Sequence, residues 1–138
     1  MKVLYQTEAT TTGGGRDGGH GSVKDEGLTV EFSTPGAGRP GNNPEQLVAL
    51  GYSACFSGAL HAVARRRGMK LENPSVTVRA ALGQDEASNF GLEFEVDTVL
   101  PGLSDEQAQE LTEAAHQVCP YSRGFAHGAP VKVSGRGG

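Results

Sequence analysis

The segment that decides the fold begins at Asn43, ends at Gly68 and reads NPEQLVALGYSACFSGALHAVARRRG. Asn43 is a good helix cap, Pro44 is favoured at the first helical position, and Gln46 has the spacing of a capping box. Gly68 is suited to end a helix, because glycine adopts the left-handed conformation without strain. We therefore predict a helix from Pro44 to about Arg67.

This predicted helix is apolar around nearly its whole circumference between Leu47 and Ala64. A helix without a wide polar face must be covered on most sides. The chain has 138 residues, which is enough for one domain with one core. A domain of that size does not cover such a helix alone, so we expect a long buried central helix packed against a second copy of the chain. Polar and small residues such as Gly51 and His61 interrupt the run, so we interpret it as a buried helix and not as a membrane span.

Alternation of apolar and polar residues predicts the strands. It is weak over residues 3–12 and clear over residues 28–33 and 90–97, where one face of each strand would be buried. The remaining short strands and turns are expected at residues 22–24 (strand), 25–27 (turn), 76–80 (strand), 84–89 (turn) and 131–133 (strand).

A second helix is predicted after Ser104, which forms a capping box with Gln107. Its apolar stripe continues to Val118, and Pro120 stops it soon after Cys119. The predicted order is β-β-β-α-β-β-α-β. We therefore expect a single α+β domain over residues 1–138, with antiparallel sheets packed around two main helices in an intertwined homodimer.

Composition excludes some classes of function. A net charge of -4 argues against a nucleic-acid-binding protein. The N-terminus turns polar at once, with no apolar stretch of secretory length, so we expect a cytoplasmic protein without a membrane anchor. Two cysteines in a cytoplasmic chain are unsuited to a structural disulfide, so they are core residues or they do redox or metal chemistry.

Three motifs resemble known sites only superficially. Gly13, Gly15 and Gly18 have the spacing of a dinucleotide fingerprint, but no helix is predicted to follow them. Cys119 and the three residues after it read CPYS, like a glutaredoxin site, yet here the cysteine is expected to close a helix and not to open one. His116 and Cys119 have the spacing of half a metal site, and the other half has no recognisable spacing.

The remaining candidates for a functional site are Cys55 and Cys119, together with Arg16 and Glu45. Cys55 stands in the middle of the apolar helix, and Cys119 lies beside the apolar stripe of the other, so both thiols are expected to face one core region. Each residue also has a structural interpretation. Free cysteines often serve as small core residues. Arg16 suits a solvated loop, and Glu45 suits the start of a helix, where the dipole favours a carboxylate.

Three motifs together resemble the organic hydroperoxide resistance protein family, a branch of the osmotically inducible protein C superfamily. They are NPEQL from Asn43, GYSACF from Gly51 and HQVCPYS from His116, and a Gly-Gly-Arg loop precedes them. The resemblance covers essentially the whole chain and becomes weaker after Ser122. It implies a dimeric thiol peroxidase, an oxidoreductase that reduces organic hydroperoxides, including those of fatty acids, to alcohols and protects against oxidative stress.

The resemblance also implies a role for each candidate residue. Cys55 would be the peroxidatic cysteine and Cys119 the resolving cysteine, while Arg16 and Glu45 would be the partners of the thiolate. No bound cofactor is implied. A dihydrolipoyl dithiol would be the reducing co-substrate, supplied by lipoylated proteins and their dehydrogenase. The candidates for an apolar substrate pocket, chosen by composition, are Tyr52, Phe56 and Phe125.

Helix geometry adds one expectation about the dimer. Glu45 and Cys55 are ten residues apart on one helix, which places them about 15 Å apart along its axis. A glutamate side chain does not span that distance. If Glu45 orients an arginine that touches Cys55, the carboxylate comes from the other subunit, and the active sites lie at the interface.

Two alternatives remain open from the sequence. The cysteine pair would also serve a non-enzymatic redox sensor or a small-molecule binding module. A metal-binding protein built on His116 and Cys119 is the third possibility.

Overall fold

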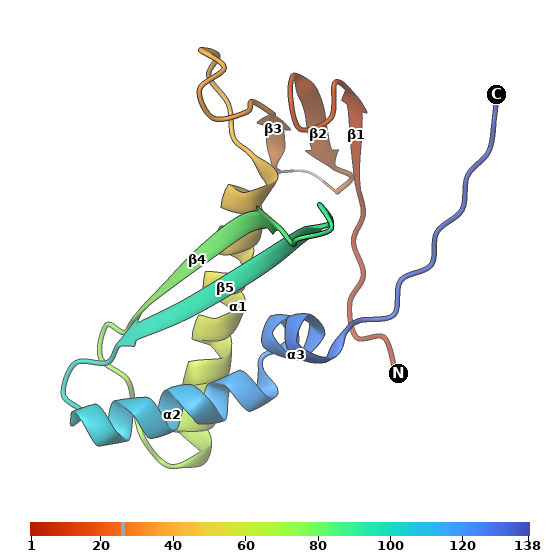
Figure 1. The fold of residues 1–138 in the computed structure, drawn as a ribbon. Helices are drawn as coiled ribbons and strands as arrows, with labels where there is room; N and C mark the ends of the chain where they lie inside the picture. The colour runs from red at the N-terminus through yellow and green to blue at the C-terminus, as the bar shows by residue number, and fades with distance from the viewer. Residues whose placement is uncertain (26) are drawn as a thin grey trace. The chain divides into compact units, whose positions relative to one another are not determined.

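The structure is a computed structural model that describes residues 1–25 and 27–138. The chain divides into two compact units, Met1–Val48 and Ala49–Gly138. Figure 1 shows the order of the strands and helices along the chain. The fold is α+β, as the sequence predicts, whereas the extent of a single domain over residues 1–138 stays a prediction.

The first unit contains a small antiparallel sheet with the strand order β1-β2-β3. Its strands are β1 (Ala9–Gly13), β2 (Gly19–Val23) and β3 (Thr29–Glu31). The first strand starts later than predicted, because its pairing with β2 ends at Ala9 and Val23, beyond which the Lys24 amide donates one further hydrogen bond to the carbonyl of Glu8. β3 ends at Glu31, one or two residues earlier than predicted, although the backbone of Phe32 still exchanges hydrogen bonds with Gly18 and Gly19 and also forms an isolated bridge with Asn42. The turn expected at 25–27 includes residue 26, which lies outside the described residues.

Helix α1 (Pro44–Arg66) begins and ends as its sequence predicts. The Asn43 Oδ1 atom accepts a hydrogen bond from the Gln46 amide at 2.8 Å, and the Gln46 side chain accepts one from the Asn43 amide at 2.9 Å. At the other end Gly68 has a φ of 69°, and the Met69 amide donates to the carbonyl of Ala64 at 2.9 Å. These bonds satisfy groups that a helix end leaves unpaired.

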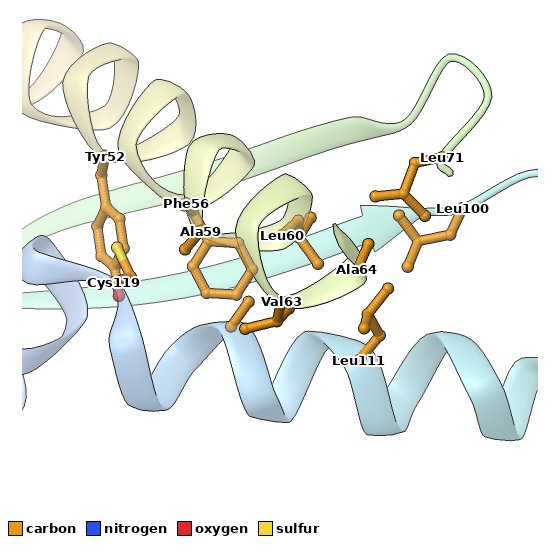
Figure 2. Packing of buried hydrophobic residues seen from close by; sticks show 11 residues of the cluster. Tyr52, Phe56, Ala59, Leu60, Val63, Ala64, Leu71, Leu100, Leu111 and Cys119 are labelled. Carbon is orange, nitrogen blue, oxygen red and sulfur yellow. The ribbon is translucent and has the colours of Figure 1, made fainter. Parts of the chain in front are cut away.

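In the second unit, helices α1 and α2 (Asp105–Val118) and a β-hairpin pack around one core. The hairpin pairs β4 (Ser75–Gln84) with β5 (Phe90–Val99), and it is followed by α2 and α3 (Pro120–His127). Figure 2 shows the buried side chains between α1, α2 and the hairpin. The members of this core are Tyr52, Phe56, Ala59, Leu60, Val63, Ala64, Leu71, Leu100, Leu111, Ala115 and Cys119.

One face of α1 forms this core, while other sides of the helix remain exposed. Leu50, for example, is 68% exposed. The helix is long and apolar enough to cross a membrane by length and composition, a property that it shares with core helices of soluble proteins. The expected second copy of the chain would cover the exposed sides, and that copy stays a prediction at this point.

The end of the chain differs from the prediction. Pro120 does not only stop α2, because it also occupies the first position of the additional helix α3. The strand expected at residues 131–133 is wrong for the described chain, where this segment pairs with no strand and Val131 and Val133 are 79% and 92% exposed. The observed order is therefore β-β-β-α-β-β-α-α.

Replacement of Leu111 by alanine tests the packing of α2. Its side chain is buried in the core, so Leu111→Ala is expected to lower the free energy of unfolding by about 2–5 kcal/mol. The neighbouring exposed Glu110 provides the control, because Glu110→Ala is expected to change it by less than about 0.5 kcal/mol. Urea unfolding of both variants measures the difference, and equal losses would contradict the described core.

Candidate functional site

A tight glycine-rich loop carries Arg16. The loop joins β1 to β2, and a Cβ atom added at Gly14 would lie 2.3 Å from the carbonyl oxygen of Asp17. A side chain at this position is therefore excluded by the close approach of the backbone. No helix follows the loop before β2, which removes the structural context of a dinucleotide site.

Arg16 is paired with Glu45 within the chain. The Arg16 Nη2 atom lies 2.5 Å from Glu45 Oε1, and the two side chains are 44% and 19% exposed. Glu45 lies in the first turn of α1, where the helix dipole favours a carboxylate. An ion pair between Asp17 and Arg39 holds the next residue of the loop. The Arg16 side chain is thus held by an ion pair with Glu45 and is not an unpaired charge on the loop.

The two cysteines meet in the second unit, although 64 residues separate them in the sequence. Cys55 lies near the middle of α1, and Cys119 links α2 to α3. Their Sγ atoms are 3.6 Å apart, and both thiols are free. Cys119 is completely buried, whereas Cys55 is partly exposed. A disulfide needs about 2.05 Å, so a small movement closes it.

Burial raises the pKa of the Cys55 thiol above its ordinary value. The backbone N–H of Tyr121 opposes this effect and lowers the pKa, while the contact with Cys119 raises it. Desolvation disfavours the charged form of a thiol because the anion loses its hydration. Within the unit Ala49–Gly138, the surroundings of Cys55 therefore disfavour its thiolate on balance.

Helix α3 contributes to this site, although it was not predicted from the sequence. Cys119 is both the C-cap of α2 and the N-cap of α3. The expectation that it only closes a helix is therefore incomplete. Consequently the amide of Tyr121, in the first turn of α3, faces the Cys55 sulfur. Pro120 is the signal for this helix, since proline is favoured at a first helical position.

An open cavity of about 380 Å³ lies beside the core of the second unit. Its lining residues are Tyr52, Phe56, Phe94, Val96, Thr112, Glu113, His116 and Gln117. Two of the three predicted pocket residues, Tyr52 and Phe56, are therefore in its wall. Phe125 is not in the wall, but its ring stacks on Phe94 with the centroids 4.4 Å apart. Phe94 was predicted only as a strand residue with a buried face.

The four residues predicted to take part in the thiol chemistry thus form two pairs. Arg16 and Glu45 lie in the unit Met1–Val48, and Cys55 and Cys119 lie in the unit Ala49–Gly138. Among residues 1–25 and 27–138 there is no group of three or more metal-binding side chains. The spacing of His116 and Cys119 therefore gains no further ligand in this part of the chain.

Comparisons with known proteins agree with this fold. The family described as OsmC-like protein matches residues 35–134. The organic hydroperoxide resistance protein of Xanthomonas axonopodis pv. citri is 43% identical over 126 residues, which are 88% of this chain and 87% of that protein. The organic hydroperoxide resistance protein OhrB of Bacillus subtilis is 39% identical over 136 residues, covering 95% of this chain and 97% of its own length.

A solved structure is similar over nearly the same extent. The crystal structure of an organic hydroperoxide resistance protein from Elizabethkingia anophelis superposes with a TM-score of 0.82 at 44% identity, and 92% of each chain is covered. The chain belongs to the OsmC-like family and, within it, to the organic hydroperoxide resistance proteins. The resemblance found in the sequence motifs is therefore confirmed.

Replacement of Cys119 by alanine tests the electrostatics of the cysteine pair. The contact with Cys119 raises the pKa of Cys55, so Cys119→Ala is expected to lower that pKa. The pH dependence of the alkylation rate, followed on the Cys55 peptide by mass spectrometry, measures the shift. An increase would contradict this description, because it would mean that Cys119 stabilises the Cys55 thiolate by donating to it.

Proposed function

We propose that this protein is a thiol peroxidase that reduces organic hydroperoxides to alcohols. The observation that supports the proposal best is the 3.6 Å separation of two free thiols that come from different helices. Two thiols at this distance are readily oxidised to a disulfide and reduced again to the dithiol. Membership in a family named for organic hydroperoxide resistance supplies the substrate class.

In the first step the Cys55 thiolate attacks one oxygen of the hydroperoxide. The O–O bond breaks, the sulfur becomes a sulfenic acid, and the alkoxide leaves and takes up a proton to give the alcohol. Only the thiolate is nucleophilic, and burial raises the pKa of Cys55. We propose that the Arg16 guanidinium restores the thiolate and stabilises the charge that moves onto the leaving oxygen.

In the second step Cys119 attacks the sulfur of the Cys55 sulfenic acid. An S–S bond forms, and hydroxide leaves and is protonated to water. An external dithiol of the dihydrolipoyl type then opens the disulfide by exchange, through a mixed disulfide, and is itself oxidised to a cyclic disulfide. Lipoylated proteins and their dehydrogenase are the proposed source of this reductant, and no bound cofactor takes part.

The cavity suits a substrate with an apolar tail. Its volume of about 380 Å³ is in the range of small-ligand sites, and aromatic side chains including Tyr52 and Phe56 form its apolar wall. These two residues lie within one turn of Cys55 on α1. We propose that Tyr52 and Phe56 bind the alkyl or acyl chain. Phe125 would act indirectly, by stacking on the ring of Phe94 in the cavity wall.

We propose an obligate homodimer in which the active sites are shared between subunits. Glu45 and Cys55 lie on the same continuous helix, about 15 Å apart along its axis. Arg16 is paired with Glu45 in the same chain, so the subunit that supplies the carboxylate also supplies the arginine. The pair of one subunit would then serve Cys55 of the partner subunit. A cytoplasmic location suits this reaction, because the reducing environment keeps both thiols free.

Turnover tests the peroxidase activity. Wild-type protein is expected to reduce cumene hydroperoxide with dihydrolipoamide, whereas Cys55→Ser is expected to be inactive because it lacks the nucleophile. Cys119→Ser is the matched control, since without the resolving thiol and without added dithiol it is expected to consume about two equivalents of hydroperoxide, one to form the Cys55 sulfenic acid and one to form the sulfinic acid, and then stop. Loss of hydroperoxide is followed by a colorimetric assay. A wild-type protein that forms the disulfide without turnover would favour the redox sensor instead.

Mixed dimers test the sharing of the active site. Cys55→Ser and Arg16→Ala are each expected to be strongly impaired alone. Co-expressed with different affinity tags and purified as a mixed dimer, they are expected to regain one working site, because the intact Arg16 of one chain meets the intact Cys55 of the other. If arginine and cysteine of the same chain acted together, the mixed dimer would remain as impaired as its parents.

A further inference from the structure

A buried hydrogen bond between two hydroxyl groups lies beside the cysteine pair. The hydroxyl of Tyr52 and the Oγ atom of Ser122 are 2.7 Å apart, and both residues are buried. The core around them is otherwise largely apolar. Polar groups in such a place are costly unless they are paired, so this bond holds its two partners together.

The bond joins the same two segments as the sulfur contact. Tyr52 precedes Cys55 by three residues on α1, and Ser122 follows Cys119 by three residues in α3. Each cysteine is therefore about one helical turn from the bond. Together the Tyr52–Ser122 bond and the contact between the sulfurs clamp the first turn of α3 against α1.

Aromatic packing supports the same placement. A Cβ atom added at Gly51 would lie 2.9 Å from the hydroxyl oxygen of Tyr121, so glycine at this position allows α3 to approach α1 closely. The ring of Tyr52 lies 5.8 Å from that of Tyr121 and 5.5 Å from that of Phe125, measured between centroids. Because α3 has only eight residues, such tertiary contacts and not its own propensity hold it in position.

We propose that Tyr52 and Ser122 are positioning residues for the second chemical step, and that their hydrogen bond keeps Cys119 in place to attack the oxidised Cys55. This inference rests on the peroxidase function proposed above. The sulfurs are 3.6 Å apart before oxidation and must approach to about 2.05 Å. A loosened α3 would spend part of its time with Cys119 displaced, and the S–S bond would form more slowly.

The consequence is a competition between two fates of the sulfenic acid. Attack by Cys119 releases water and forms the disulfide. A second hydroperoxide instead transfers its oxygen to the sulfur, giving a sulfinic acid and one further molecule of alcohol. The sulfinic acid is not reduced by dithiols, so the positioning of Cys119 protects the enzyme against inactivation.

The experiment compares these fates in Ser122→Ala and in Tyr52→Phe. Reduced proteins are mixed with excess cumene hydroperoxide, and the ratio of disulfide to Cys55 sulfinic acid is measured by mass spectrometry. Each variant is expected to lower this ratio by about 3- to 10-fold, the value of one hydrogen bond. The double variant is expected to lower it no further, because both changes remove the same interaction.

Thr98→Val is the matched control. It removes another hydroxyl pair of the same unit, since Thr98 Oγ1 lies 2.7 Å from Thr112 Oγ1, and that pair joins β5 to α2 and involves neither α1 nor α3. This variant is expected to lower thermal stability and to keep the wild-type ratio.

An unchanged or higher ratio in Ser122→Ala and Tyr52→Phe would overturn the positioning role, and so would an equal drop in Thr98→Val. A wild-type protein that forms neither disulfide nor sulfinic acid would overturn the peroxidase function itself. The two failures are therefore distinguishable.

Discussion

The burial of a reactive sulfur is the constraint on which the site depends. Cys55 lies on the apolar central helix, where desolvation raises the pKa of its thiol, yet its proposed reaction needs the anion. The same burial brings Cys55 within 3.6 Å of Cys119, and the neighbours of Cys55 on α1, Tyr52 and Phe56, line the cavity. The features that make the pair suitable for disulfide chemistry therefore oppose its ionisation, and the rest of the site must supply a compensating charge.

Two features of the chain are suited to supply it. The first turn of α3 turns the amide of Tyr121 toward the Cys55 sulfur, which lowers the pKa in part. The Arg16 guanidinium is held by Glu45 and stays partly exposed, so that it can also contact a second anion. Arginine suits this role better than lysine, because its charge persists when it is desolvated and its planar group donates several hydrogen bonds. In the proposed dimer this pair reaches the sulfur of the other subunit.

The sequence was sufficient where local chemistry decides the structure. Asn43, Gln46 and Ser104 specify their helix caps by side chains that reach their own backbone, and both capping boxes are present. It was insufficient where long-range contacts decide. Helix α3 exists because aromatic residues dock it on α1, and the Tyr52–Ser122 bond joins positions 70 residues apart. The valines at 131 and 133 alternate like a strand, but a strand also needs a neighbour to pair with.

The pKa of Cys55 in wild-type protein and in Arg16→Gln tests the central claim most directly. It is obtained from the pH dependence of alkylation of the Cys55 peptide in the fully reduced protein. The account predicts that the pKa is about 1–3 units higher in Arg16→Gln than in wild-type protein, since a nearby cation favours the thiolate. The same pKa in both proteins would contradict it, because the guanidinium would then have no part in holding the sulfur as an anion.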